Sequence, residues 1–434
     1  MVGDHIHQLL VKREKADTLI NIAVLGTGWF GSGLIQELFR YRGMEPRVVF
    51  TQDAEKATDI LADNGVSRSN IRAVRTPAEL RRGLDKGQYL VSEVSELIAE
   101  LKGIDAVFDT TGNILFGAQA ALDTLQNGRH FITISAELDC AVGPELAAIA
   151  AENKVIYSVC DGDQPGCLAR VIHEAKSFGM EIIVAGNCKG FLDVHKTPED
   201  IMPWVRPGQN PKMITAFTDG TKQAMELATV ANAFGLKPDK RGMHGPKTSK
   251  SSLVQDFLKI ITQKGVVDYT LGIDGVDQGG GIFVIGKREG DRISEDMAYL
   301  KKGEGPYYLF FRDHHLCYFE APRSISDVVL LGVPTMAPIG RSADVFAVAK
   351  RDLKAGERLD GIGGYTVYGL IDAAETVRAQ NLFPVGLAEQ AVVNTDIPQD
   401  VPLTWKMIDL AEDNVVLQLM RQGKQPPAKE NLKV

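Results

Sequence analysis

The first third of the chain alternates between short apolar runs and stretches in which apolar residues have helical spacing. Each apolar run has the length of a buried strand and is too short for a helix. Strands that alternate with helices predict a parallel sheet with helices on both faces. The predicted strands are Leu19–Leu25, Val48–Phe50, Ala106–Phe108, Phe131–Ile134 and Val155–Val159, and the predicted helices include Gly33–Arg40, Phe116–Leu125 and Gly143–Ala151.

The pattern changes after Pro165. A helical stretch, Gly166–Phe178, leads into a strand, Ile182–Val184, and later apolar runs are spaced like hairpins. This spacing predicts a mixed α/β region with a largely antiparallel sheet. The hairpin-like runs are Val266–Leu271, Ile282–Ile285, Tyr307–Phe311 and Leu316–Phe319. From Arg341 onward, short runs such as Val345–Ala349 and Tyr365–Leu370 predict a third, mostly β region.

A glycine-rich turn follows the first predicted strand directly. Gly26, Gly28 and Gly31 have the spacing G-x-G-x-x-G and lead into a helical stretch. In dinucleotide-binding folds the first glycine permits a tight turn, the second lets a pyrophosphate approach the backbone, and the third allows close packing of helix and strand. The amino end of the helix adds amide donors and a favourable dipole. The context therefore favours a Rossmann dinucleotide-binding domain over a purely structural turn.

The choice between NAD and NADP depends on the residue that ends the second strand, where an acid usually holds the ribose 2′-hydroxyl. Here Thr51 has that position, and Asp53 comes two residues later. Without an acid to repel a 2′-phosphate, the sequence favours NADPH. The alternative is that Asp53 binds the ribose and the cofactor is NAD.

Two further strand ends should lie beside the nicotinamide, because ligands of open parallel sheets bind at the carboxyl edge. The fourth strand continues into Thr110–Asn113, and the fifth is followed by Ser135 and Glu137. Glu137 is explained equally well as a turn residue. The candidate cofactor-binding residues are Gly26, Thr27, Gly28, Trp29, Phe30, Gly31, Thr51, Asp53, Thr110, Thr111, Gly112, Asn113, Ser135 and Glu137.

The fold class predicted from these patterns is α/β, with three domains, because 434 residues exceed what a single core usually supports. We expect an NAD(P)-binding Rossmann domain over residues 1–162 and a central mixed α/β catalytic and dimerisation domain over 163–340. A mostly β domain is expected over 341–434.

Composition narrows the partners and the location. The chain has 48 Lys and Arg against 56 Asp and Glu, a net charge of −8, which disfavours nucleic-acid binding through a basic face. Its five cysteines form no C-x-x-C pair, which disfavours a disulfide framework or a structural zinc site. Residues 1–20 lack the apolar core of a signal peptide, and the apolar run 328–333 is too short to span a membrane. We therefore expect a soluble cytoplasmic protein without a nucleic-acid or membrane partner.

Cations gather among small polar residues in the central region. The loop Lys240–Lys250 places Arg241 and Lys247 on either side of His244, with glycines between them. In an acidic protein, such a cluster suits a phosphorylated substrate held by charge-assisted hydrogen bonds. The alternative is an ordinary solvated surface. The candidate substrate-binding residues are Arg241, Lys247, Ser249, His315, Arg323 and Ser324.

Histidines and lysines of the same region are candidates for proton transfer and charge stabilisation. His244 and His314 have side chains that titrate near neutral pH. Lys189, Lys212 and Lys222 could polarise substrate oxygens. The sequence has no motif for a divalent metal, so a requirement for Mg²⁺ or Mn²⁺ is left open. These five residues form the candidate catalytic set.

The glycine turn Gly26–Gly33, the strand edge Asp109–Asn113 and the order of domains resemble homoserine dehydrogenase and its relatives. Within that group, residues 15–340 resemble the proteins called 1-deoxy-D-xylulose 5-phosphate reductoisomerase-like, and Ala349–Glu357 resembles the SAF (antifreeze-like) modules of several enzymes. The resemblance implies a homodimer that uses NADPH to convert 1-deoxy-D-xylulose 5-phosphate to 2-C-methyl-D-erythritol 4-phosphate, a precursor of isoprenoids.

One departure argues against homoserine as the substrate. The dehydrogenase family carries an Asp and a Lys four residues apart on a helix, whereas Lys222 and Glu226 hold the matching positions here. A helix tolerates the reversed pair, but the lysine no longer occupies the same point. The alternative functions are a dehydrogenase of another polyol phosphate or hydroxy acid, and a nucleotide-binding sensor without turnover.

Overall fold

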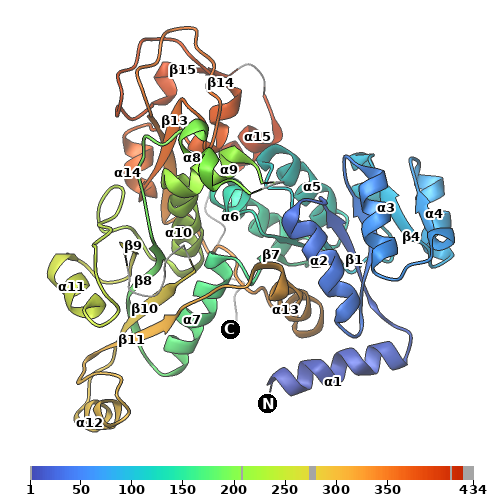
Figure 1. Ribbon diagram of the computed structural model, residues 1–434, viewed down its shortest axis with the longest axis horizontal. Helices are drawn as coiled ribbons and strands as arrows, with labels where there is room; N and C mark the ends of the chain where they lie inside the picture. The colour runs from blue at the N-terminus through green and yellow to red at the C-terminus, as the bar shows by residue number, and fades with distance from the viewer. Residues whose placement is uncertain (1, 207–208, 273–279, 411–412, 424–434) are drawn as a thin grey trace. The chain divides into compact units, whose positions relative to one another are not determined.

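The computed structural model describes residues 2–206, 209–272, 280–410 and 413–423, and it divides into two compact units (Figure 1). The N-terminal unit comprises residues 1–163, 316–337 and 414–434. The central unit comprises residues 164–315 and 338–413. The chain therefore leaves the N-terminal unit twice and returns to it twice. The three-domain division expected from the sequence stays a prediction.

The N-terminal unit is built on a seven-stranded sheet in the order β3-β4-β2-β1-β5-β6-β7. All of its strand pairs are parallel, which confirms the predicted α/β class with a Rossmann-like sheet. Two short strands, β3 and β4, were missed by the sequence pattern because each has only a few apolar positions. The strands are β1 Ile20–Leu25, β2 Met44–Phe50, β3 Ile71–Ala73, β4 Tyr89–Ser92, β5 Ala106–Asp109, β6 His130–Thr133 and β7 Tyr157–Val159.

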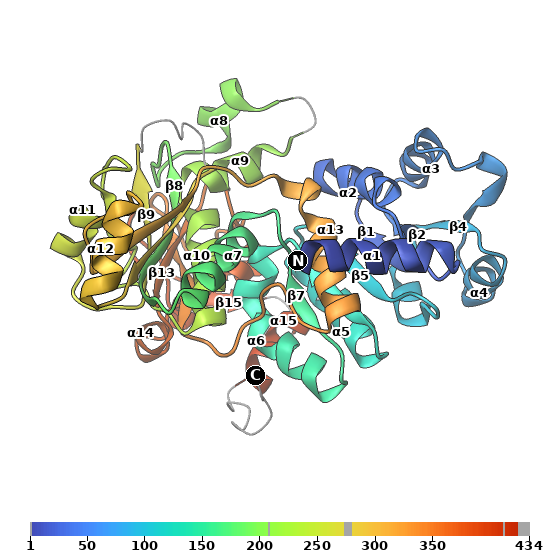
Figure 2. The same cartoon turned by 90° about the horizontal axis from the view of Figure 1, so that it is seen from below.

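Helices cover both faces of this sheet. Figure 2 shows α2 and α3 on one side of β1 and β2, and α4 and α5 on the other. This arrangement follows from right-handed crossovers, because the chain moves across the sheet in opposite directions on the two sides of β1. The helices of the unit are α1 Val2–Lys15, α2 Trp29–Arg40, α3 Ala54–Asp63, α4 Pro77–Asp85, α5 Ile114–Gln126, α6 Ala136–Glu152, α13 Ala321–Ser326 and α15 Val415–Gln422.

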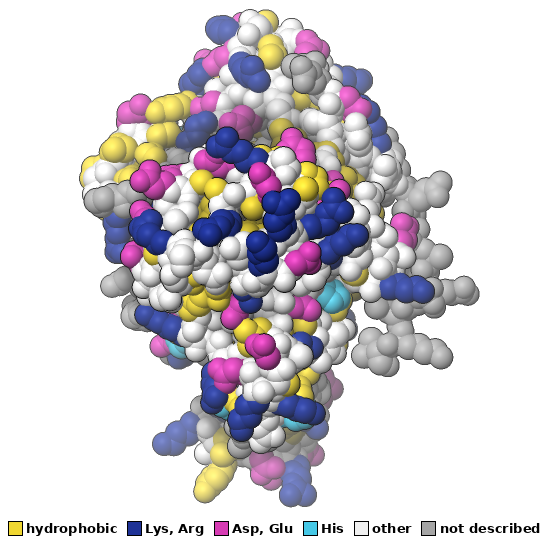
Figure 3. Space-filling view, turned by 90° about the vertical axis from the view of Figure 1, so that its right-hand side faces the viewer, with side chains coloured by type: hydrophobic (Ala, Val, Ile, Leu, Met, Phe, Trp, Pro, Cys, Tyr) yellow, Lys and Arg dark blue, Asp and Glu magenta, His cyan; other side chains and the backbone are white. Residues whose placement is uncertain are grey.

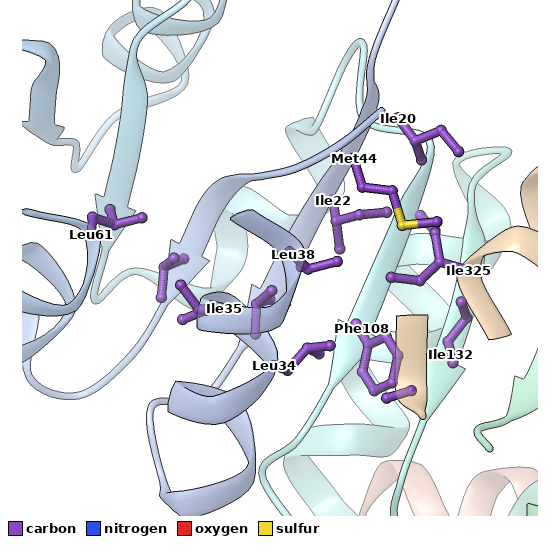
Figure 4. Packing of buried hydrophobic residues seen from close by; sticks show 14 of the residues in the cluster. Ile20, Ile22, Leu34, Ile35, Leu38, Met44, Leu61, Phe108, Ile132 and Ile325 are labelled. Carbon is purple, nitrogen blue, oxygen red and sulfur yellow. The ribbon is translucent and has the colours of Figure 1, made fainter. Parts of the chain in front are cut away.

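The core of the N-terminal unit lies between α2 and the sheet (Figure 4). Leu38 of α2 lies beside Ile22 of β1, and Leu34 of α2 points toward Phe108 of β5. Ile325 of α13, about three hundred residues further along the chain, completes the same cluster. All five side chains are almost completely buried. The glycine turn is therefore held in place by α2, whose apolar face packs against the sheet.

The central unit contains a four-stranded sheet in the order β11-β10-β8-β9. Strands β8 and β9 are parallel, and β10 is antiparallel to both of its neighbours. The strands are β8 Glu181–Lys189, β9 Val266–Leu271, β10 Ile282–Lys287 and β11 Tyr307–Arg312. The helices of the unit are α7 Gln164–Ser177, α8 Pro198–Ile201, α9 Pro211–Thr218, α10 Thr221–Phe234, α11 Leu253–Ile260, α12 Asp291–Tyr299 and α14 Ala374–Ala379.

The C-terminal part of the central unit holds two small antiparallel sheets. One pairs β12 (Ala343–Ala349) with β13 (Val367–Ala373), and the other pairs β14 (Ala391–Val393) with β15 (Ile408–Leu410).

One predicted strand is wrong. Leu316–Phe319 does not pair with a neighbour but contains a short 3₁₀ helix, η4, at Cys317–Phe319. The backbone of Cys317 has a positive φ of 52°, which no strand accommodates. The alternation of apolar residues in this segment instead serves contacts with α2.

The glycine turn depends on close backbone packing at Gly31. A Cβ atom at this position would lie 2.2 Å from the carbonyl oxygen of Gly26 and 2.5 Å from Oγ1 of Thr110. Gly28 differs, because a Cβ there would meet no atom within 4 Å and its φ of −66° suits any residue.

We predict that Gly31→Ala destabilises the protein by about 2 kcal/mol or more, because backbone atoms cannot move away from the added methyl group. Gly28→Ala is the matched control, with an expected cost of about 1 kcal/mol or less from its poorer helix capping. Chemical denaturation of both variants measures the difference. Equal stability of the two variants would contradict the packing described here.

Candidate functional site

The glycine turn joins the end of β1 to the start of α2. Gly26 has a φ of +97° and donates its amide to the carbonyl of Phe50 at 2.8 Å, which ties the turn to β2. On the other side, the Thr110 hydroxyl donates to the carbonyl of Leu25 at 2.7 Å. Gly28 is the N-cap of α2, and no side chain caps this helix. The N–H groups of the first turn of α2 are thus available to bind an anion, and Gly28 leaves space next to them.

The end of β2 is shaped by two threonines and a helix cap. The hydroxyls of Thr27 and Thr51 lie 2.8 Å apart. Asp53 Oδ1 accepts a hydrogen bond from the amide of Lys56 at 2.9 Å, so Asp53 caps α3. Glu93 Oε1, from the end of β4, lies 3.3 Å from the amide of Ala54 on the same helix. Both carboxylates near this strand end therefore face the amino end of α3.

The ends of β5 and β6 are connected through a buried carboxylate. Asp109 accepts hydrogen bonds from the hydroxyls of Thr111 at 2.7 Å and Thr133 at 2.9 Å. Burial raises the pKa of Asp109, although these hydrogen bonds oppose the shift. Asn113 and Ser135 then cap α5 and α6 with their side-chain oxygens. These caps place the predicted residues of both strand ends at the carboxyl edge of the sheet.

All of the predicted cofactor-binding residues thus belong to the N-terminal unit and cluster at the carboxyl ends of β1, β2, β5 and β6. Glu137 is buried and its carboxylate accepts from the Ser135 hydroxyl at 3.2 Å, which fits the turn interpretation as well as a ligand role. The individual cofactor contacts stay predictions.

A buried polar cluster is formed in the central unit, where β8 ends. Lys189 is almost completely buried, and its Nζ donates to Gln164 Oε1 at 2.9 Å. The same Nζ lies 3.5 Å from Glu226 Oε2 on α10. Asn187, on the same side of β8, donates to Gln164 at 2.9 Å, while its Oδ1 has no hydrogen-bond partner among the described residues. The end of β8 therefore brings together the Lys189 ammonium, the Glu226 carboxylate and the Asn187 side-chain oxygen, which accepts no hydrogen bond from the described residues.

Helix α10 brings two further polar residues to this region. Lys222 and Gln223 are buried at its first turn, next to the turn formed by Asp219 and Gly220. Both amide atoms of Gln223 lack a hydrogen-bond partner among the residues described. The sequence predicts Lys189 and Lys222 as candidate catalytic residues, but it does not predict Gln164 or Gln223. Their only signal was a polar residue within the first turn of a helix.

The start of α10 is anchored by a buried ion pair with the C-terminal part of the unit. Lys350 Nζ lies 2.7 Å from Asp219 Oδ2 and also donates to the carbonyls of Lys196 and Gly364, each at 2.8 Å. Asp219 in addition accepts the amide of Thr221 at 2.9 Å. Burial raises the pKa of Asp219, although Lys350 acts in the opposite direction. This pair fixes the turn that precedes Lys222.

The cationic loop Lys240–Lys250 is tied down by two aspartates. Asp268 is buried and accepts the amides of His244 at 3.0 Å and Gly245 at 3.0 Å. His244 Nε2 lies 2.8 Å from Asp239 Oδ2. Arg241 pairs with Asp372 at 2.9 Å, and its guanidinium lies over the ring of Phe346. The phosphate-binding role of Arg241 stays a prediction, and it would require Arg241 to exchange this pair for a ligand.

The other predicted substrate and catalytic residues are spread over both units. Lys247 is exposed, and Ser249 contacts Ser252 at 2.6 Å. Lys212 donates to the carbonyl of Asp360 at 2.6 Å. His314 lies 2.6 Å from Asp313 Oδ1, and His315 Nδ1 lies 3.3 Å from the carbonyl of Gly280. Arg323 and Ser324 belong to the N-terminal unit, where they contact Asp161 at 3.5 Å and 2.7 Å.

A local basic face lies on the N-terminal unit despite the negative net charge. Lysine and arginine side chains gather on the side of the molecule that carries α4 (Figure 3). The exposed cations along residues 68–86 are Arg68, Arg72, Arg75, Arg81, Arg82 and Lys86. The expected absence of a nucleic-acid partner stays a prediction. Within the described residues, every helix is too short or too polar to cross a membrane.

One family model and several solved structures are similar to parts of this chain. Residues 162–321 match a family described as oxidoreductase DRL, catalytic domain. A probable dehydrogenase from Thermotoga maritima is 12% identical, with 72% of this chain and 90% of that chain covered and a TM-score of 0.40. A putative oxidoreductase from Klebsiella pneumoniae is 17% identical, with 74% and 88% covered and a TM-score of 0.38. GenD2 from gentamicin A biosynthesis, in complex with NAD, is 13% identical, with 73% and 88% covered and a TM-score of 0.39.

No curated protein matches the chain. The family match contains Lys189, Lys222 and Glu226, and it supports the broader prediction that the protein is an oxidoreductase.

The specific family assignment made from the sequence is wrong. Residues 162–321 match a family described as oxidoreductase DRL, catalytic domain, and neither 1-deoxy-D-xylulose 5-phosphate reductoisomerase nor homoserine dehydrogenase is indicated, so the predicted conversion of 1-deoxy-D-xylulose 5-phosphate is wrong. The glycine turn and strand edge misled because dinucleotide-binding folds in general share them. The SAF-like assignment of Ala349–Glu357 is unsupported as well, because the family match ends at residue 321.

We predict that Lys350→Met destabilises the protein by about 3–5 kcal/mol at neutral pH, because it leaves Asp219 buried without its cation. A buried acid whose pKa is raised by folding destabilises the folded state when it ionises, so the protein loses stability as the pH rises through the folded pKa. The loss of stability caused by Lys350→Met should therefore be smaller near about pH 5 than near about pH 8. The matched control is Lys354→Met, which breaks an exposed pair with Asp396 and should cost less than about 1 kcal/mol. Urea denaturation at both pH values measures this, and equal effects of the two variants would contradict it.

Proposed function

We propose that this protein is an NADPH-dependent oxidoreductase that interconverts a carbonyl and an alcohol on a small polar substrate. The observation that carries the proposal is the glycine turn: its backbone is fixed by Gly31, Gly28 leaves open space, and no side chain caps α2. Amides and a helix dipole directed at an empty space suit a pyrophosphate. The family match to an oxidoreductase catalytic domain supports the same class of reaction.

The preference for NADPH rests on the end of β2. Thr51 carries no charge, and the Asp53 carboxylate is engaged as the cap of α3 by the Lys56 amide at 2.9 Å. Neither side chain is therefore placed as the acid that holds a ribose 2′-hydroxyl and repels a 2′-phosphate. The finding that would reverse the preference is an Asp53 side chain that leaves the α3 cap when a dinucleotide binds.

Lys189 is the proposed proton donor. When bound, a reduced nicotinamide would supply the hydride that reduces the carbonyl carbon of the substrate. The Lys189 ammonium then gives a proton to the oxygen, which becomes the alcohol, and the lysine recovers its proton from solvent. Gln164 and Glu226, at 2.9 Å and 3.5 Å, hold Nζ in place. A buried, pre-oriented cation stabilises the developing alkoxide more strongly than a solvated one.

The substrate class is proposed from the charge of the Lys240–Lys250 loop. The cations of the Lys240–Lys250 loop favour a phosphorylated substrate, and we retain this and the homodimer as proposals.

We predict that Gly28→Asp abolishes dinucleotide binding while the protein stays folded. Asp is a favourable N-cap for α2, yet its carboxylate would occupy the space and the field meant for the pyrophosphate. Titration calorimetry with NADPH and NADH should give a loss of about a hundredfold or more for Gly28→Asp and a clearly smaller loss for the uncharged isostere Gly28→Asn. Undiminished binding by Gly28→Asp would show that the turn is purely structural.

We predict that Lys189→Met removes turnover but leaves NADPH affinity near that of the wild type, because Lys189 belongs to the central unit rather than to the glycine turn. A panel of sugar phosphates, polyols and hydroxy acids, followed by the absorbance of reduced nicotinamide, first identifies a substrate. The variant should then lose about 10²–10⁴-fold in kcat. Wild-type kcat in Lys189→Met would assign the proton transfer to another group.

A further inference from the structure

Two segments that are distant in sequence meet at the start of α2. The ring of Tyr318, from η4, lies edge-on to Trp29 with centroids 5.2 Å apart and an interplanar angle of 68°. It also makes an edge contact with Phe30 at 6.1 Å. Gly33 leaves the necessary room, because a Cβ there would lie 2.5 Å from the Tyr318 ring. The first turn of α2 thus has a second support besides the sheet.

The backbone around Tyr318 is itself fixed. The amide of Cys317 donates to the carbonyl of Gly162 at 2.8 Å, and a Cβ at Gly162 would lie 1.9 Å from the Cys317 carbonyl oxygen. The amide of Leu316 donates to Glu320 Oε2 at 2.9 Å. All of these residues belong to the N-terminal unit. The Tyr318 ring is therefore a rigid neighbour of Trp29 rather than a mobile one.

Trp29 is the residue that this arrangement leaves without cover. Its side chain is 66% exposed, although it is a large aromatic group that follows Gly28 directly. An indole ring presents an apolar face and one N–H donor, so it can exclude water from an anion and also bind it. The indole ring lies next to the uncapped N–H groups of α2. Together, these groups suit contact with the pyrophosphate of a dinucleotide better than exposure to solvent.

We propose that Tyr318 is a positioning residue for the cofactor: it holds the Trp29 indole against the pyrophosphate of a bound dinucleotide. This inference rests on the proposed function. It assigns part of the cofactor affinity to a segment almost three hundred residues away from the glycine turn. The contact needs the aromatic ring of Tyr318 and not its hydroxyl.

The test titrates NADPH into the full-length wild type, Tyr318→Ala and Tyr318→Phe. Calorimetry should give about tenfold weaker binding for Tyr318→Ala, as expected for the loss of an aromatic pair, and recovery to nearly wild-type affinity for Tyr318→Phe. Phe319→Ala is the matched control, because it removes a neighbouring exposed ring, which lies 4.5 Å from the Tyr318 ring at an interplanar angle of 37°. Its affinity should stay close to that of the wild type.

A spectroscopic measurement separates positioning from general stability. The chain has three tryptophans, Trp29, Trp204 and Trp405. The part of the energy transfer to bound reduced nicotinamide that comes from Trp29, measured as the difference between the wild type and Trp29→Phe, should be clearly reduced in Tyr318→Ala at saturating NADPH. If Tyr318→Ala does not fold, Tyr318→Leu, which keeps apolar bulk without a ring, is measured instead with the same expectation.

The failures are distinguishable. A wild type that binds neither NADPH nor NADH overturns the proposed function. A wild type that binds NADPH, together with Tyr318→Ala or Tyr318→Leu of unchanged affinity and unchanged energy transfer, overturns the role of Tyr318 alone.

Discussion

The absence of a side chain at Gly31 is the constraint on which the N-terminal unit depends. At this position α2 lies so close to the end of β1 that a single methyl group would overlap the Gly26 carbonyl and the Thr110 hydroxyl. The approach joins three elements, because Thr110 follows β5 and Gly26 is bonded to β2. Once α2 is fixed there, its apolar face reaches Ile22, Phe108 and the distant Ile325. The open, uncapped amino end of the helix is the result of this packing.

In the central unit, the structure depends on buried charged side chains that are paired. Transfer of Lys189 and Lys350 from water is costly unless each ammonium finds acceptors, and both do. The Lys350–Asp219 pair also links β12 to the turn before α10, which carries Lys222 and Glu226. Residues 338–413 are therefore part of the same compact unit as the candidate catalytic residues. Lys350, from this part of the unit, stabilises the turn that precedes Lys222.

The sequence predicts the features that local pattern determines. The glycine spacing locates the turn, and the apolar runs locate the longer strands, because both are properties of a few consecutive residues. Predictions from local sequence are wrong or incomplete where a contact with a distant residue determines the structure. Arg241 reads as a free cation, yet its partner Asp372 lies 131 residues away. Leu316–Phe319 reads as a strand, yet its conformation follows from a ring that packs on Gly33. Gln164 and Gln223 carry only a weak local signal, a polar residue in the first turn of a helix, because their significance comes from the side chains around them.

The most direct test of the central claim is a crystal structure of this protein grown with NADPH. Our account predicts that pyrophosphate oxygens accept hydrogen bonds from backbone amides in the turn at Gly28 and the first residues of α2, with the Trp29 indole in contact. A dinucleotide bound at any other part of the chain, or a glycine turn left empty in crystals that are saturated with NADPH, would contradict the account.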